Sequence, residues 1–418
     1  MKILFITPFL PYPPVSGGRL QTYLRMEHSR KRGHSVFLMT LGLPSDSGNV
    51  LALKKVFDGV ECIYARPDIA KIKEVFRKSL LYEIFTLDRR FGEELKLFAH
   101  NKGIDIAVFE GLGVAQYRDF IPRIPSVLYE HNVEHEITGQ LASYLRKSPL
   151  KIFGSRPDET MRNLYLYLFG GKERRLVRSL EIESIKKFDL TMTCSDRDAD
   201  ILKKDVPDAS CVTIPWAVRK PEKYWLPGDR EVRNLVFVGS MAWEPNRDAV
   251  LWFAKEIFPM VRKCPVRTKL LIAGSGMVKE IAGLDNQEDI IVKGFVPDIS
   301  ETLLEADVFI APVRFGSGVN VKVLEAMAYG LPVITTPKGA EGIKAKDLVH
   351  FMVAETREEF ALAVQHLLQN PEAGRTMGMN AKEYIATHHD IERVIGSVEE
   401  ALFNVVKAGS PPGAARRR

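Results

Sequence analysis

Five residues in one short segment have the types and spacing to hold a phosphorylated ligand: Arg314, Gly316, Gly318, Lys322 and Glu325. Gly316 and Gly318 let the chain turn sharply, and they allow backbone amides to approach an oxyanion without a Cβ atom in the way. A helix predicted to begin near Val319 would direct free N–H groups and the positive end of its dipole at the same place. The pattern therefore predicts a phosphate site.

Charged side chains flank this predicted turn. Arg314 and Lys322 add positive charge, which suits a diphosphate that lacks a bound metal ion. Glu325 lies one helical turn after Lys322, and its carboxylate can accept hydrogen bonds from two adjacent ribose hydroxyls. The segment therefore predicts a site for a nucleoside diphosphate, with no metal and no other cofactor required.

The elements that must position this segment follow a regular order. Short, β-branched runs alternate with longer helix-compatible stretches, which favours parallel sheets with helices on both faces. In the first half we predict strands at 3–7, 36–40, 104–110, 125–130, 190–195 and 211–215. In the second half we predict strands at 235–239, 269–274, 290–294, 308–313, 332–336 and 351–354. Prolines and charges interrupt the pattern at 216–233, so we expect an interdomain linker there.

Length and composition exclude several other classes of protein. A chain of 418 residues favours two domains, and no apolar run of about 20 residues could span a bilayer. The four cysteines form no CxxC pair, which argues against a disulfide framework or a structural metal and fits a reducing cytoplasm. The net charge of +6 is modest, so nucleic acid is not implied as a partner.

Basic residues concentrate in the segment 172–187 and in the terminal ARRR. Each either meets an anionic membrane surface or is simply solvated. The aromatic and basic residues within 140–187 likewise either dock on a membrane as an amphipathic element or pack against the N-terminal sheet. Residues 408–418 are rich in Pro, Gly and Arg, which predicts a disordered tail.

The segment LEAMAYGLPVI resembles the nucleotide-binding motif of retaining GT-B glycosyltransferases of family 4, the group 1 type. Family members typically carry Glu-x7-Glu followed by Ala-Met-Ala-x-Gly-x-Pro-Val. Glu325 matches the second glutamate, which the resemblance implies binds the donor ribose. Ser317 stands in place of the first, which usually lies near the donor sugar. A branch associated with polysaccharide assembly shows R-x-G-x-G-x3-K-x2-E instead, and residues 314–325 fit that pattern.

The resemblance extends to three other stretches of the second half: LVFVGSMAWEPNRDAVLWFAKEIFPMVR, GSGMVKEI and KGFVPD. It implies donor-binding roles for Gly239, Ser240, Arg247, Gly274, Gly294, Phe295, Val296, Gly316, Ser317, Gly318, Val319 and Glu325. A simple turn is the alternative interpretation of residues 294–296. Asn246 is expected to start a helix, and we interpret the aromatic residues Trp243, Trp252 and Phe253 as core or interface packing.

In the first half, the resemblance covers the first strand, its glycine-rich loop and the first helix. It implies that Gly18 and Arg19 lie near the donor phosphate and the acceptor. The cluster YEHNVEHE follows an apolar strand, where ligands gather in open α/β sheets. Family members often have a histidine there, so His131 is the leading catalytic candidate. Glu134 either orients the acceptor or caps the next helix. We assign the DRDAD string at 196–200 to helix capping rather than to a metal.

The resemblance implies two Rossmann-like, doubly wound domains that face each other across a cleft. We expect an acceptor-side domain at 1–215, a nucleotide-sugar domain at 216–390 and a last helix at about 391–407 that packs back on the first domain. The implied reaction is retaining transfer of a hexose-type sugar from a nucleotide-sugar donor to a glycan or lipid-linked glycan acceptor. His131, Arg314 and Lys322 are the catalytic candidates, and the two cations would stabilise the leaving diphosphate.

No protein nucleophile is evident, so we expect a front-side displacement in which the leaving phosphate helps to deprotonate the acceptor. Two other functions stay open: a GT-B nucleotide-sugar epimerase, and a non-catalytic glycan-assembly or membrane-adaptor protein that kept the fold. An NAD oxidoreductase is disfavoured because no GxGxxG follows the first strand. We expect a cytoplasmic protein, either free or peripheral at the inner face of the cell membrane.

Overall fold

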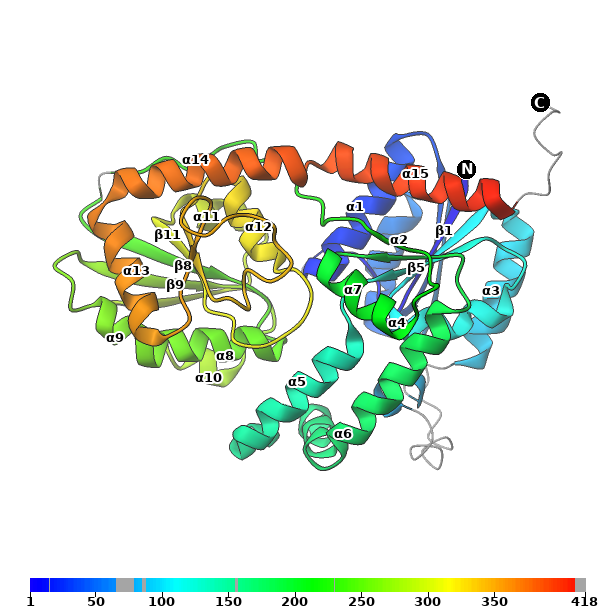
Figure 1. The fold of residues 1–418 in the computed structure, drawn as a ribbon, viewed down its shortest axis with the longest axis horizontal. Coiled ribbons are helices and arrows are strands. Elements are labelled where there is room, and N and C mark those ends of the chain that lie inside the picture. The colour runs from blue at the N-terminus through cyan, green and yellow to red at the C-terminus, as the bar shows by residue number, and fades with distance from the viewer. Residues whose placement is uncertain (15, 65–78, 85–87, 155–156, 229, 410–418) are drawn as a thin grey trace. The chain divides into compact units, whose positions relative to one another are not determined.

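The computed structural model describes residues 1–14, 16–64, 79–84, 88–154, 157–228 and 230–409. The chain divides into two compact units (Figure 1). The first comprises Met1–Pro215 together with the chain from Glu392 onward, and the second comprises Trp216–Ile391. The tail predicted to be disordered lies outside the described residues from position 410 on.

The first unit is built on a seven-stranded sheet in the order β3-β2-β1-β4-β5-β6-β7. Its strands are β1 Lys2–Thr7, β2 Ser35–Gly42, β3 Gly59–Tyr64, β4 Ile106–Glu110, β5 Ser126–Glu130, β6 Leu190–Thr193 and β7 Cys211–Thr213. Every adjacent pair is parallel. The six predicted strands are confirmed, and β3 at the sheet edge was not predicted.

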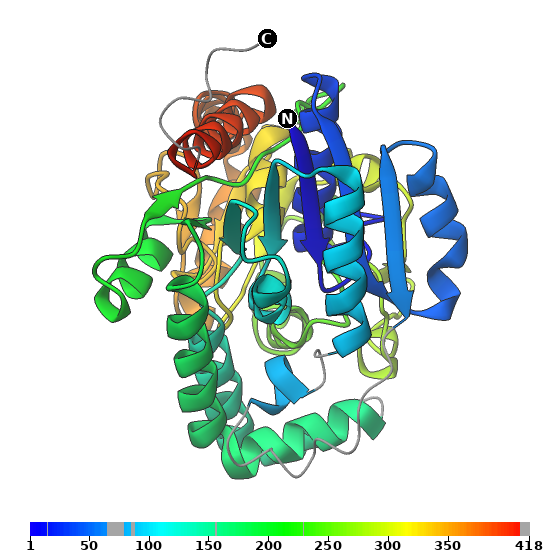
Figure 2. The same ribbon diagram turned by 90° about the vertical axis from the view of Figure 1, so that its right-hand side faces the viewer.

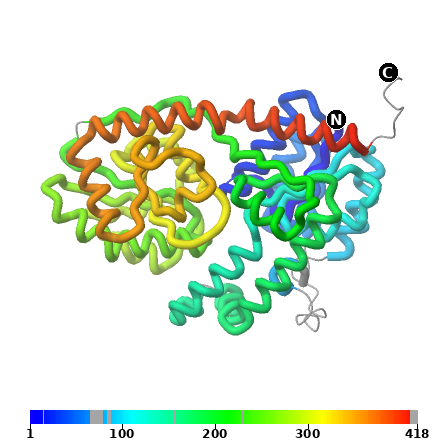
Figure 3. The backbone as a smooth tube through the Cα atoms, in the orientation of Figure 1, coloured from blue at the N-terminus to red at the C-terminus, as the bar shows by residue number. Residues whose placement is uncertain are grey.

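Helices connect these strands, as the crossover connections of a parallel sheet require. They are α1 Gly17–Lys31, α2 Ser47–Lys54, α3 Arg89–Lys102, α4 Leu112–Ala115, α5 Glu134–Lys147, α6 Pro157–Ile185 and α7 Asp196–Asp205. Short helical turns lie at Pro44–Asp46, Leu80–Ile84, Gln116–Phe120 and Pro149–Ile152. The backbone trace in Figure 3 shows that α5 and α6 extend away from the sheet of their unit.

The chain returns to the first unit through its last described helix, α15 Ile391–Gly409. His34 Nε2 lies 2.7 Å from Glu399 Oε1 on α15, and the His34 ring meets Phe403 edge-on. Arg32 Nε donates to Glu399 Oε2 at 2.8 Å. His34 and Arg32 therefore fasten α15 to the first unit.

The second unit has a six-stranded parallel sheet in the order β10-β9-β8-β11-β12-β13. Its strands are β8 Arg233–Val238, β9 Thr268–Ala273, β10 Ile290–Gly294, β11 Val308–Ala311, β12 Val333–Thr335 and β13 Met352–Val353. Its helices are α8 Glu244–Trp252, α9 Phe258–Val261, α10 Lys279–Ala282, α11 Ile299–Leu304, α12 Val321–Ala328, α13 Arg357–Gln369 and α14 Pro371–His388, with a π-helical turn at Phe253–Ile257. All six predicted strands are confirmed.

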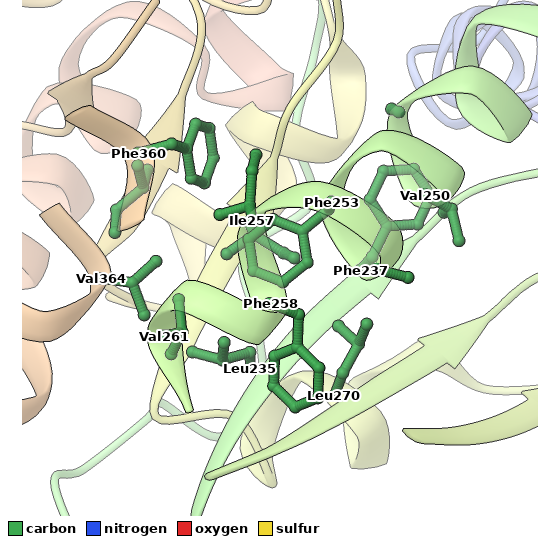
Figure 4. Close-up of a cluster of buried hydrophobic side chains, with 14 of the residues drawn as sticks. Leu235, Phe237, Val250, Phe253, Ile257, Phe258, Val261, Leu270, Phe360 and Val364 are labelled. Atoms are coloured by element: carbon green, nitrogen blue, oxygen red, sulfur yellow. The ribbon is translucent and has the colours of Figure 1, made fainter. Parts of the chain in front are cut away.

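Both sheets run outward from a central pair, β1 and β4 in one unit and β8 and β11 in the other. This doubly wound order confirms the prediction of two Rossmann-like α/β units. The sheet of the second unit packs on an apolar cluster in which Phe237, Phe253, Phe258 and Phe360 are buried (Figure 4). Burial of such aromatic side chains contributes about 1.5–3 kcal/mol each to folding.

The segment 216–233, predicted to be an interdomain linker, packs on the second unit. The backbone N–H of Trp225 donates to Tyr329 O at 2.8 Å, and its indole Nε1 donates to Ala306 O at 2.6 Å. Trp225 is buried. The prolines and charges correctly marked a break in the periodic pattern, but they gave no indication that Trp225 anchors this segment to the second unit.

Candidate functional site

In the sheet of the second unit, the direction in which successive strands are added reverses between β8 and β11. In doubly wound folds, ligands bind outside the carboxyl ends of the strands at this switch point. Gly239 follows β8, and Arg314 follows β11. Two predicted donor-binding segments, far apart in sequence, therefore emerge from neighbouring strands at the place where the fold itself favours a ligand.

Three predicted glycines lie at the carboxyl ends of the adjacent strands β8, β9 and β10. The N–H of Gly239 donates to Ala273 O at 3.0 Å, and the N–H of Gly274 donates to Gly294 O at 2.8 Å. Gly274 has φ +152°, and a Cβ atom there would lie 1.8 Å from Gly239 O. The backbones approach so closely that only glycine fits at position 274.

We expect Gly274→Ala to destabilise the second unit by about 3 kcal/mol or more, because the new methyl group must displace the Gly239 carbonyl. Urea unfolding followed by tryptophan fluorescence measures this loss. The matched control is Gly48→Ala, where a Cβ would meet nothing within 4 Å. Equal stability of the two variants would contradict the close approach of the backbones.

The predicted phosphate turn is present, with a later helix start than expected. Gly316 and Gly318 have φ +129° and +74°. The helix α12 begins at Val321 after Asn320 as its N-cap, so the prediction of a start near Val319 was wrong by two residues. Val319 and Ser317 therefore belong to the turn itself, and Lys322 and Glu325 share the first turns of α12.

Arg314 is held in place by α8. Its Nε and Nη2 donate to the two carboxylate oxygens of Asp248 at 2.9 and 2.7 Å, and its guanidinium carbon lies 4.9 Å from the centre of the Trp252 ring. Asp248 is buried, whereas the Arg314 side chain is 42 % exposed. This bidentate pair fixes the orientation of the guanidinium plane, and the exposed part of the side chain is accessible to a phosphate.

Lys322 contacts the same helix. Its Nζ bonds Asn246 Oδ1 and lies 4.7 Å from the centre of the Phe237 ring. Burial lowers the pKa of Lys322 to about 7, against the opposing effect of Glu325, and burial raises the pKa of Glu325 to about 7, against the opposing effect of Lys322. Both groups thus titrate near neutrality, where an anionic ligand strongly affects their protonation.

Several residues of the α8 segment differ from expectation. The helix begins at Glu244, so Asn246 is its third residue, where it positions Lys322 and donates through Nδ2 to Ser240 O at 2.8 Å. Arg247 is buried and ion-paired with Glu244, so its predicted phosphate contact would compete with that pair. Trp252 and Phe253 are buried, as core packing requires, whereas Trp243 is 44 % exposed and does not belong to the core.

The remaining predicted donor contacts lie on the loops after β8, β9 and β10. Ser275 Oγ donates to Ser240 Oγ at 3.1 Å, which joins the first two loops. Phe295 follows Gly294 and exposes 59 % of its surface, an unusual cost for a phenylalanine. With Val296 beside it, this ring offers a flat apolar face at the edge of the site.

In the first unit, His131 belongs to a buried charge network. Its Nε2 lies 2.7 Å from Glu110 Oε2. Glu110 also accepts from Arg25 at 2.5 Å and from Thr22 Oγ1 at 3.1 Å. Burial alone would raise the pKa of Glu110, but Arg25 and His131 together lower it to about 2. Arg25 and Glu110 were not predicted as site residues, because no local pattern links them: they come from α1 and β4.

The glycine-rich loop lies beside this network. α1 begins at Gly17, and a Cβ atom on Gly18 would lie 3.7 Å from His131 Nδ1. The guanidinium carbon of Arg19 lies 5.6 Å from the centre of the Phe9 ring. The structure therefore brings Gly18 and His131 together at the switch point between β1 and β4.

Glu134 starts α5 and is partly buried among other acids. Its carboxylate accepts from Tyr82 Oη at 2.5 Å, and its backbone N–H donates to Glu181 Oε1 at 2.5 Å. Burial raises the pKa of Glu134 to about 7, although the Tyr82 bond acts the other way. The cap of α5 is thus Glu181, which the sequence did not suggest, and the capping alternative for Glu134 was wrong.

The DRDAD string is confirmed as the start of α7. Ser195 precedes the helix, and its side chain accepts from the backbone N–H of Asp198 at 3.2 Å. Among the described residues, no group of three or more His, Cys, Asp or Glu side chains is arranged to hold a metal ion. Of the helices in that part of the chain, none is long and apolar enough to cross a membrane.

The chain is similar to known proteins in part of its sequence and in its fold. Residues 232–370 match the family model described as "Glycosyl transferases group 1", a range that includes every predicted donor-binding residue of the second unit. A curated relative, "Uncharacterized 44.6 kDa protein in cps region" of Klebsiella pneumoniae, is 22 % identical over 408 residues, which span 95 % of this chain and 98 % of that protein.

Solved structures share the architecture over almost the whole chain. Sucrose-phosphate synthase from Thermosynechococcus elongatus is 15 % identical with a TM-score of 0.69, and the alignment covers 98 % of this chain and 100 % of that one. Anabaena Alr3699/HepE in complex with UDP and glucose is 15 % identical with a TM-score of 0.65, covering 96 % and 99 %. The predicted GT-B fold is thereby confirmed.

Proposed function

We propose that this protein is a glycosyltransferase that moves a sugar from a nucleotide-sugar donor to a glycan or lipid-linked glycan. The main support is the position of Arg314, Lys322 and Glu325 at the switch point of the second unit, where Arg314 and Lys322 both contact α8. Most of this unit matches the group 1 family model. Cations, helix-end amides and a ribose-binding carboxylate together suit a nucleoside diphosphate. Alr3699/HepE, a structural relative, was solved with UDP and glucose.

In this proposal the leaving diphosphate lies against the turn at 316–318 and the first amides of α12. Arg314 donates through in-plane N–H groups that do not point at Asp248, and Lys322 stabilises the charge that develops on the leaving oxygen. Glu325 accepts from the ribose hydroxyls. The departing phosphate oxygen takes the acceptor proton as the new glycosidic bond forms on the same face, so the configuration is retained and no protein nucleophile is needed.

The first unit supplies the acceptor side. His131, fixed by Glu110, presents a ring edge for a sugar hydroxyl, with Gly18, Arg19 and Glu134 as neighbouring candidates. The resemblance of residues 314–325 to a polysaccharide-assembly branch and the cps-region relative support a surface polysaccharide as the product. A cytoplasmic position, peripheral to the membrane, completes the proposal.

We expect Glu325→Ala to weaken binding of the donor nucleotide about 10- to 100-fold, because hydrogen bonds to a charged group are worth about 1.5–3 kcal/mol. A thermal-shift panel of UDP, GDP, ADP and TDP sugars first identifies the base that raises the melting temperature. Titration of that nucleotide into the variant then measures the loss. The matched control is Glu372→Ala, an exposed glutamate in the first turn of α14.

Activity assays separate the alternatives. Donor hydrolysis or transfer that disappears in Glu325→Ala excludes a non-catalytic adaptor. Incubating the protein with nucleotide sugar alone tests the epimerase, because an interconverted sugar formed without any acceptor would sink the transferase proposal. Absence of a thermal shift with all four nucleotides would argue against a nucleotide site altogether.

A further inference from the structure

The helices α5 and α6 form a hairpin whose two arms are tightly packed. Figure 2 shows the first part of α6 running along the lower edge of the first unit, with its second part rising toward the sheet. A Cβ atom on Gly170 would lie 2.3 Å from the Cβ of Ala142, so α5 and α6 touch closely there. Ala142, Leu145 and Leu166 are buried on the inner side. The hairpin is therefore a well-packed part of the first unit.

Its outer side is apolar as well, although it faces solvent. Met161, Leu164 and Leu168 recur at i, i+3 and i+7 along α6, opposite the buried Leu166 and Gly170, so they form one stripe. Six large side chains on and just before α6 are exposed, between 44 % and 85 %, and we call them the hairpin apolar face: Leu150, Phe153, Met161, Leu164, Leu168 and Phe169. A cluster of this kind marks an interaction site.

The part of the hairpin around this face is basic. Residues 141–175 contain eight Lys and Arg and three Asp and Glu, a net charge of +5, whereas the acids of the hairpin outside this segment lie nearer its two ends. Two of the acids are turned inward: Glu159 and Glu173 are buried, and Glu173 accepts from Ser79 Oγ and Tyr165 Oη at 2.7 Å each. The charge presented to solvent is therefore strongly positive.

We propose that the hairpin apolar face docks on an anionic membrane surface. Its apolar side chains would enter the boundary between lipid headgroups and acyl chains, while the surrounding lysines and arginines bind lipid phosphates. A second copy of the chain fits less well, because a symmetric dimer would oppose two such basic segments. The inference rests on the peripheral membrane position in the proposed function and deepens it by naming the docking surface, and vesicle binding tests it without any transferase activity.

Sedimentation of the full chain with vesicles tests this assignment. We expect binding to vesicles of phosphatidylglycerol and phosphatidylcholine, weak binding to phosphatidylcholine alone, and weaker binding as salt is raised. The triple variant Met161→Gln, Leu164→Gln, Leu168→Gln should bind the anionic vesicles at least ten-fold more weakly. Its melting temperature should be unchanged, because all three side chains are exposed.

A matched control replaces one methionine and two leucines of similar exposure elsewhere: Leu97→Gln, Leu362→Gln, Met379→Gln. This control should bind vesicles like the wild type, and donor hydrolysis should be unchanged in both triple variants. Equal vesicle binding by the wild type and the hairpin variant would overturn the proposal. So would a wild-type dimer, seen by light scattering, that dissociates in the hairpin variant without any change in vesicle binding.

Discussion

Lys322→Met is expected to lower the rate of sugar transfer by about 100- to 1000-fold, the effect of removing one preorganised charge from a developing oxyanion. The variant should stay folded, because a methionine fits the apolar surroundings that already disfavour the charged amine. Steady-state kinetics with the identified donor measures the loss, which should fall mainly on kcat. Lys263→Met, at an exposed position after α9, is the matched control and should leave the rate unchanged.

The pH dependence of nucleotide binding distinguishes this electrostatic role from a steric one. Burial lowers the pKa of Lys322 to about 7 in the free protein, and a bound diphosphate would raise it again. Binding therefore takes up a proton, and wild-type affinity should fall as pH rises above 7. Calorimetric titrations in buffers of different ionisation enthalpy would detect this uptake. A slope in Lys322→Met equal to that of the wild type would exclude Lys322 as its source.

The sequence predicted the strands of both sheets well, because buried parallel strands are continuous apolar runs with little ambiguity. The strand β3 is the exception, and it shows that this prediction depends on burial of the whole strand. Its sequence GVECIY carries Glu61 and Cys62, and its residues are mostly only partly buried at the edge of the sheet. An edge strand needs no continuous apolar run, so its local signal is too weak to separate it from a loop.

The sequence predicted those residues of the candidate site whose role depends on local backbone conformation. It did not predict the roles of side chains that come from distant parts of the chain. Gly274 and Gly316 could be predicted from the sequence, because both have positive φ angles that favour glycine. Asp248 and Asn246, which hold Arg314 and Lys322, lie 66 and 76 residues away from them. Only the topology of the sheet, which places α8 beside the end of β11, brings these partners together, and no local pattern reports it.

The buried network of the first unit should carry the largest effect on stability. Glu110→Ala is expected to reduce the free energy of unfolding by about 3–5 kcal/mol, because it leaves the Arg25 guanidinium buried without its carboxylate. Arg25 has little room to escape, since its guanidinium carbon lies 3.8 Å from the centre of the Tyr129 ring. Urea unfolding monitored by circular dichroism measures the change, and Glu61→Ala on the exposed side of β3 is the control.

The same residue predicts how stability depends on pH. The pKa of Glu110 is about 2 in the folded protein and near its ordinary value of 4.5 in the unfolded chain, so the unfolded chain binds the proton more readily. Its contribution is therefore fully present above pH 4.5 and is lost as pH falls toward 2. The deficit of Glu110→Ala should be largest at neutral pH and should shrink below pH 4.5. If the deficit stayed constant down to pH 3, the ionised Glu110–Arg25 pair would not be its cause, and cavity formation would be. Glu110→Leu with Arg25→Leu separates the two, because it removes both charges, and it should recover most of the stability lost in Glu110→Ala.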